Sequence, residues 1–246
     1  FLWSETLFIL EILLFIIAYW KYMHGHTLKA LIITAIITAV ACITRYAGIT
    51  IVGTGCLLIL LDFELPVKKK IGHLLLYGML SISLLVANLA YNSSVTGLST
   101  GTREPSITPF SQNQFRVGTV INDWGALSNR ADSFAILVAC VIMLSLIGVL
   151  AWKTFKQLIN SYENVVIGFA VVYGLFMVIL ATFSRFEPIN SRLLSPMFIP
   201  LLISCTSWVP DVLKLAHSAI LKYSLAVAAI AAMLLFEYAT VKIDYQ

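Results

Sequence analysis

The sequence predicts an all-α protein, a polytopic transmembrane helix bundle of about eight spans with one long external loop. Hydrophobic residues make up 60% of the 246 residues and charged residues only 11%, and the mean hydropathy is +0.93. Soluble domains carry roughly 25% charged residues. The apolar residues also gather in runs long enough to cross a bilayer, and polar turns separate these runs. We therefore expect residues 1–246 to form a single transmembrane domain.

The first apolar run, residues 6–22, begins shortly after Trp3 and has Trp20 in its last turn. A helix of about 18 residues is roughly 27 Å long, enough to span a membrane with aromatic anchors at both ends. Seven further runs follow, and Gly48, Gly53 and Gly55 are expected to allow close helix contact at the third. The expected spans are 6–22, 27–44, 47–61, 71–91, 133–152, 165–183, 193–208 and 223–240.

The stretch between the fourth and fifth runs, residues 92–131, is rich in Asn, Ser, Thr, Gly, Pro and Arg. Such a segment cannot lie in hydrocarbon, because its backbone polar groups would lack hydrogen-bond partners there. We expect an external loop. Residues 93–114 have a turn-rich, mobile composition. Residues 115–127 carry spaced apolar side chains, which favour an interfacial helix on the membrane surface.

Lysine and arginine fall on opposite sides when the expected spans alternate in direction, with Lys242 as the exception. The positive-inside rule makes the lysine side cytoplasmic and the arginine side external. We expect a multi-pass integral protein, in the plasma (inner) membrane of a bacterium in preference to the endoplasmic reticulum. The lysines are Lys21, Lys29, Lys68, Lys69, Lys70, Lys153, Lys156, Lys214 and Lys222. The arginines are Arg45, Arg103, Arg116, Arg130, Arg185 and Arg192.

Arg45 and Arg192 are the strongest candidates for binding an anion. Each lies next to an expected span, at the depth of a lipid phosphate, and a guanidinium group binds phosphate through two parallel hydrogen bonds. Pro196 and Pro200 are expected to interrupt and bend the helix that begins near Arg192, which would expose its first-turn amides to an anion. The alternative is that these arginines are interfacial anchors or form salt bridges between loops. Residues 210–222 are expected to form a loop or an interfacial stretch.

Other polar groups carry weaker signals. Glu11 lies about two turns inside the first span, so it is either a functional acid or a carboxyl group paired or protonated within the bundle. His24 and His26 lie in a short basic loop, where a solvated turn is a simpler interpretation than a metal site. The four cysteines fall inside apolar runs without a CxxC pair, which favours inert buried thiols.

Three short motifs resemble those of a family of membrane enzymes. They are WSETLF at 3–8, TRYAGI at 44–49 and RLLSPMFIPL at 192–201. In this order they are similar to motifs of the GT-C superfamily of membrane glycosyltransferases, which includes protein O-mannosyltransferases and lipid A aminoarabinose transferases. The resemblance implies a polyprenyl-phosphate sugar donor held among membrane lipids, and transfer to a glycan, lipid or protein acceptor on the external face.

The resemblance also implies roles for individual residues. Arg45 and Arg192 would bind the donor phosphate with Arg185 nearby, Glu5 would orient an arginine or touch the sugar, and Glu187 would balance an arginine. Members of the superfamily carry their catalytic acid in the first external loop, so we expect this chain to be N-terminally truncated and its catalytic residue is unknown. Some members use a divalent metal, so the resemblance leaves a divalent metal open, but no ligand cluster in this sequence demands one and the sequence establishes no cofactor.

Two other functions remain open at this stage. A polysaccharide ligase or polymerase would use the same external arginines, long loop and lipid-linked donor. A transporter or a non-catalytic lipid-binding subunit would place polar groups along a path through the membrane, and only Glu11 clearly does so. A nucleic-acid partner is not indicated, because the positions of the charges beside the spans explain the net charge of +4.

Overall fold

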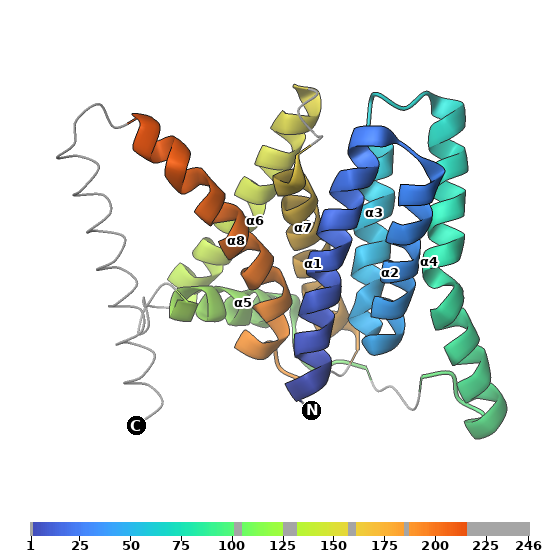
Figure 1. Cartoon of the computed structure of the whole chain (residues 1–246). Helices are drawn as coiled ribbons and strands as arrows, with labels where there is room; N and C mark the ends of the chain where they lie inside the picture. Colours follow the sequence, from blue (N-terminus) through green and yellow to red (C-terminus); the bar gives the residue numbers. More distant parts are fainter. Residues whose placement is uncertain (1, 101–104, 125–131, 157–160, 185–186, 216–246) are drawn as a thin grey trace.

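The computed structural model describes residues 2–100, 105–124, 132–156, 161–184 and 187–215. Over these residues the fold is all-helical, as the sequence predicts (Figure 1). The elements are α1 (Leu2–Gly25), α2 (Leu28–Thr44), the 3₁₀ helix η1 (Tyr46–Gly48), α3 (Ile49–Leu61), α4 (Val67–Thr96), α5 (Phe110–Trp124), α6 (Asp132–Phe155), α7 (Tyr162–Phe183) and α8 (Ser191–Leu215).

Four of these helices, α1, α4, α6 and α7, are long and apolar enough to cross a membrane. Helices α2 and α3 and the first part of α8 are apolar but shorter. The expected eighth span, at 223–240, lies outside the described residues. The structure therefore supports the membrane character of the chain, whereas the number of spans stays a prediction.

The bundle is built around α1, α2, α3, α4 and α7. Helix α2 packs against α1 and α4, and α3 packs against α4 and α7. These helices run side by side. Helix α5 runs crosswise to them and lies beside α6, near the end where the chain begins (Figure 1). The core consists largely of aromatic and aliphatic side chains from α1, α3 and α7, with Phe15, Tyr19 and Phe169 fully buried. Many large apolar side chains point outward from the bundle, as expected where lipid is the solvent.

Two close contacts confirm the predicted role of the glycines. A Cβ atom added to Gly48 would lie 2.5 Å from the carbonyl oxygen of Ala41, so the turn from α2 into α3 has no room for a side chain. A Cβ atom at Gly55 would lie 2.4 Å from the ring of Tyr77. The hydroxyl group of Tyr19 donates to the carbonyl oxygen of Gly55 at 3.3 Å, which brings α1 to the same place.

The segment predicted as a loop at 92–131 is partly helical. Helix α4 continues to Thr96 and ends at Gly97, which is left-handed with φ 74°. The hydroxyl groups of Ser94 and Thr96 bond to carbonyl oxygens of the preceding turn, so these polar side chains find acceptors within the helix itself. The interfacial helix expected at 115–127 corresponds to α5, which begins five residues earlier, at Phe110.

The expected interruption of the seventh span is wrong. Helix α8 continues through Pro196 and Pro200 and extends to Leu215, so part of the segment predicted as a loop at 210–222 is also helical. A proline removes one backbone donor, which frees the carbonyl group four residues earlier. The carbonyl oxygen of Arg192, freed by Pro196, accepts a hydrogen bond from the hydroxyl group of Ser195 at 2.8 Å. This bond compensates for the missing donor.

Candidate functional site

The carboxylate of Glu5 joins two arginines from distant parts of the chain. Its Oε1 atom lies 3.0 Å from Nη1 of Arg45 and 3.1 Å from Nε of Arg192. Glu5 is in the first turn of α1, Arg45 follows the last residue of α2, and Arg192 is in the first turn of α8. The three helix ends therefore meet at one end of the bundle, which we call the arginine end. The opposite end, at the α1–α2 and α3–α4 turns, is the lysine end.

A second carboxylate completes this group. Nη2 of Arg192 forms an ion pair with Oε2 of Glu187, and the side chain of Asn190 donates to Oε1 of Glu187 at 3.2 Å. We call Glu5, Arg45, Glu187 and Arg192 the Glu5 cluster. Its two guanidinium groups and two carboxylates balance in formal charge. The structure thus shows that Glu5 contacts both arginines and that Glu187 contacts Arg192, while their roles toward a substrate stay predictions. Arg185 lies outside the described residues.

The members of the Glu5 cluster differ in exposure. The side chain of Glu5 is 12% exposed and that of Arg45 is 21% exposed, whereas Arg192 is 49% and Glu187 43% exposed. An ion pair is stronger where water is excluded, because the local dielectric is lower. The Glu5–Arg45 pair is therefore the fixed part of the cluster. The Arg192–Glu187 pair is the part that an anion from solution can reach.

The start of α8 is capped by its own sequence. The backbone N–H of Leu193 donates to Oδ1 of Asn190 at 3.0 Å, and that of Leu194 donates to the Asn190 carbonyl oxygen at 3.2 Å. Asparagine is a favoured N-cap residue for this reason. The expectation that the first-turn amides of α8 are open to an anion is wrong for these two groups. These two amides are therefore occupied, and the guanidinium group of Arg192 is the charged group at this helix end that can bind an anion.

A cavity of about 430 Å³ lies beside Arg45. Ligand pockets have volumes of roughly 300–1,000 Å³, so this one suits a small polar headgroup. Arg45 and Tyr46 line one side, and the C-terminal half of α7 and Leu193 of α8 line the rest. Arg45 therefore borders both the Glu5 cluster and the cavity. The residues that line it are Arg45, Tyr46, Ala47, Thr100, Tyr173, Phe176, Met177, Leu180, Ser184 and Leu193.

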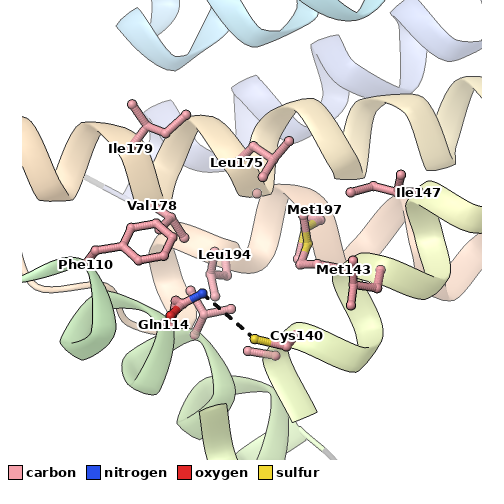
Figure 2. Close-up of a pocket in the computed structure, with 14 residues that line it drawn as sticks. Phe110, Gln114, Cys140, Met143, Ile147, Leu175, Val178, Ile179, Leu194 and Met197 are labelled. Carbon is pink, nitrogen blue, oxygen red and sulfur yellow. Dashed lines mark hydrogen bonds between the residues drawn. The ribbon is translucent and has the colours of Figure 1, made fainter. Parts of the chain in front are cut away.

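A second cavity, of about 260 Å³, lies on the other side of α7, between α5, α6 and α8. Figure 2 shows apolar side chains around it, including Phe110 from α5, Met143 from α6 and Met197 from α8. Its polar contact is a weak hydrogen bond from Nε2 of Gln114 to Sγ of Cys140, at 3.9 Å. Such a cavity suits a hydrocarbon chain. The sequence carries no signal for it, because its walls are ordinary apolar residues from four separate helices.

Glu11 lies inside the bundle, one and a half turns beyond Glu5 on α1. It is 5% exposed, and the hydroxyl group of Thr44 donates to its Oε1 atom at 2.7 Å. Its Oε2 atom has no hydrogen-bond partner among the described residues. The carboxyl group is thus bonded within the bundle, as one of the two interpretations of the sequence expects. Thr44 directly precedes Arg45, so Glu11 is close to the site.

The histidines of the α1–α2 turn have different surroundings. The Nδ1 atom of His24, which is exposed, lies 2.9 Å from the carbonyl oxygen of Trp20 one turn earlier. In contrast, Nε2 of His26 lies 2.7 Å from Oδ2 of Asp62, at the end of α3. Glu64 is close enough to complete a group of three metal-ligand side chains within the described part of the chain. The expectation that His26 is part of a simple solvated turn is therefore wrong, because its partner is 36 residues away in the sequence.

Comparison with protein-family models, curated proteins and solved structures finds no match for this chain. The assignment of a substrate therefore depends on the geometry of the Glu5 cluster and on the three motifs described above.

Proposed function

We propose that this chain belongs to a multi-pass membrane glycosyltransferase of the GT-C type, and that its arginine end binds the phosphate of a polyprenyl-phosphate-linked sugar. The observation that carries the proposal is the convergence of Arg45 and Arg192 on Glu5, beside a cavity. These arginines belong to two of the three motifs that resemble the superfamily, and Glu5 belongs to the third. Chain segments far apart in sequence thus meet at one place.

The arrangement suits a phosphate that gains charge during the reaction. When a sugar leaves a lipid phosphate, negative charge develops on the phosphate oxygens, and preorganised cations stabilise it. A guanidinium group has five N–H donors in a planar fork, and the contacts to Glu5 use one nitrogen of each arginine. Donors therefore remain for a ligand. Glu5 would hold both forks in place, and the more exposed Glu187 would give up its position at Arg192 to the phosphate.

The remainder of the bundle fits a lipid-linked donor on the external side of a bacterial plasma membrane. The lysines of the described helix turns lie at the other end, which the positive-inside rule assigns to the cytoplasm. The apolar cavity between α5, α6, α7 and α8 can take a hydrocarbon segment. The acceptor would be a glycan, a lipid or a protein, and the general base would come from a part of the enzyme other than this cluster, because both of its carboxylates bind arginine.

The direct test is the binding of a fluorescent short-chain polyprenyl phosphate to the full chain in nanodiscs. Arg45→Ala and Arg192→Ala should each weaken binding about ten- to a hundredfold, the equivalent of about 1.5–3 kcal/mol for a charged hydrogen bond. Lysine at either position should restore only part of the affinity, because the planar fork is lost. Far-UV circular dichroism checks that each variant is folded.

Arg116→Ala provides the matched control. Arg116 is on α5, and it is neither part of the Glu5 cluster nor among the residues that line the larger cavity. Replacing Arg116 by alanine should leave the binding of the polyprenyl phosphate unchanged. A polyprenol without phosphate should bind equally to the wild type and to every variant. Full affinity in folded Arg45→Ala and Arg192→Ala proteins would refute the proposal and leave the arginines as structural anchors.

A non-catalytic transport or lipid-binding subunit is the second candidate, and Glu11 is the observation that favours it. A buried acid inside a membrane helix commonly marks a transport path. Under this alternative, Glu11→Gln would abolish movement of a fluorescent polyprenyl-phosphate lipid across proteoliposomes and leave its binding intact. Sugar transfer by the intact enzyme, retained in Glu11→Gln and lost in Arg45→Ala, would exclude it.

A further inference from the structure

We propose that the lysine end of the bundle carries a binding site for a zinc-class divalent cation, formed by His26, Asp62 and Glu64. One ligand atom from each of these side chains lies within 4.8 Å of the other two. An imidazole nitrogen with two carboxylate oxygens is a donor set that suits Zn²⁺, Co²⁺ or Mn²⁺. Calcium and magnesium, in contrast, take oxygen ligands. The site does not depend on the proposed glycosyltransferase function, and it lies at the opposite end of the bundle.

The backbone holds His26 in an uncommon conformation that directs its ring toward α3. Its φ angle is 46°, the single positive value at a non-glycine residue in the described part of the chain. Such a conformation costs free energy and persists where the surroundings enforce it. The backbone N–H of His26 donates to the carbonyl oxygen of Tyr22 at 2.7 Å, and its ring packs edge-on against the Tyr22 ring, 5.7 Å between centroids. Tyr22 is itself bonded through its hydroxyl group to Nδ1 of His73, at 2.8 Å.

The carboxylate of Asp62 is buried, and each of its two oxygen atoms has a polar partner that fixes its orientation. The residue is 3% exposed, Oδ2 lies 2.7 Å from Nε2 of His26, and Oδ1 accepts the backbone N–H of Glu64 at 2.9 Å. Burying a carboxylate is costly unless a cation or several hydrogen bonds compensate for the lost water. A metal ion at Oδ2 would provide this compensation and would keep the bond to Glu64 intact.

The distances between the three candidate ligand atoms are close to those in a metal site. Metal–ligand bonds of about 2.1 Å in tetrahedral geometry place ligand atoms roughly 3.4 Å apart. His26 and Asp62 are closer than this, at 2.7 Å, because they share a hydrogen bond, and Glu64 lies up to 4.8 Å away. A bound ion would therefore separate the first pair slightly and draw Glu64 inward. Glu64 is exposed at the surface, and water would complete the coordination.

A bound ion would fasten the α1–α2 turn to the α3–α4 turn. His26 belongs to the first turn and the two acids to the second, so the ion would connect two helix pairs. A ligand that binds the folded protein and not the unfolded chain raises the stability of the fold. The midpoint of thermal unfolding should therefore rise with the concentration of Zn²⁺ or Co²⁺.

The test uses Co²⁺ as a spectroscopic probe, with the full chain in detergent and without a histidine tag. We expect visible d–d absorption that saturates at one Co²⁺ per chain and disappears when Zn²⁺ is added. Loss of a group that only supports a metal ligand weakens binding about 10–100-fold. His26→Ala and Glu64→Gln, which remove ligands, should weaken it by at least about tenfold. Glu64→Gln is the decisive variant, because an exposed side chain can be changed without loss of the fold.

His24→Ala is the matched control. It removes a histidine two residues away in the same turn, whose Nδ1 atom faces the Trp20 carbonyl. It should bind Co²⁺ like the wild type. The proposal is overturned if the wild type shows no saturable d–d absorption, if Glu64→Gln binds as tightly as the wild type, or if His24→Ala is as weak as His26→Ala. In each of these cases the 2.7 Å contact between His26 and Asp62 is a hydrogen bond that joins the two turns without a metal.

Discussion

Replacing Glu5 by glutamine should destabilise the fold, chiefly through Arg45. The substitution keeps the shape of the side chain and removes the charge that two guanidinium groups share, at 3.0 and 3.1 Å. A hydrogen bond to a charged group is worth about 1.5–3 kcal/mol, and breaking a fully buried ion pair costs about 3–5 kcal/mol. Since Glu5 is 12% and Arg45 21% exposed, we expect the free energy of unfolding to fall by about 2–3 kcal/mol.

A double-mutant cycle separates the two contacts of Glu5. The coupling free energy between Glu5 and Arg45 should be about 1–2 kcal/mol, because both side chains are largely buried. The coupling between Glu5 and Arg192 should stay below about 1 kcal/mol, because Arg192 is 49% exposed and water screens it. The measurement is unfolding by sodium dodecyl sulfate from mixed micelles, followed by far-UV circular dichroism, with glutamine at each position.

Glu187→Gln is the control for this cycle, because Glu187 is 43% exposed and pairs with the half-exposed Arg192, not with Arg45. Its effect on the free energy of unfolding should be about 0–1 kcal/mol. The reasoning is refuted if Glu5→Gln changes the free energy of unfolding by less than about 0.5 kcal/mol, or if the coupling to Arg192 equals the coupling to Arg45.

Two further predictions concern packing and topology. Gly55→Ala should lower the free energy of unfolding by about 1–3 kcal/mol, because the new methyl group would meet a tyrosine ring at 2.4 Å, whereas Gly72→Ala, with nothing within 4 Å, should be neutral or slightly stabilising. Single cysteines placed at Lys69, in the first turn of the long helix α4, and at Ser99, just beyond its C-terminal end, should react with membrane-impermeant reagents from opposite sides of sealed vesicles. Labelling of both from one side would contradict the expected orientation.

Hydropathy located the helices because burial in lipid selects apolar side chains along the whole of a span. It misplaced their ends for a physical reason. A helix is held by backbone hydrogen bonds, which polar residues make as well as apolar ones, and at the end of α4 the hydroxyl groups of Ser94 and Thr96 find acceptors in the preceding turn. It also continues through a proline where another donor serves the freed carbonyl, as Ser195 does in α8. Neither the polar last turn of α4 nor the Ser195 hydrogen bond in α8 can be read from the pattern of apolar residues.

The candidate site was predictable only in part. Residue type and position in the sequence predicted Arg45 and Arg192 as anion-binding residues. The proximity of Glu5 to an arginine was expected from the resemblance. The sequence could not show that both arginines share one carboxylate, because that depends on how three helix ends pack. The contact between His26 and Asp62 was not foreseen for the same reason, since each alone is an ordinary turn residue.

The hydrogen bond from the Tyr173 hydroxyl group to the carbonyl oxygen of Leu193, at 2.7 Å, has a mechanical consequence. Tyr173 also lines the larger cavity, and Leu193 directly follows Arg192. A ligand that rotated the tyrosine ring would pull on the first turn of α8 and shift the guanidinium group of Arg192 relative to Glu5. The Tyr173 hydroxyl group is thus one link between the cavity and the first turn of α8, beside Arg45 and Leu193, which line the cavity themselves.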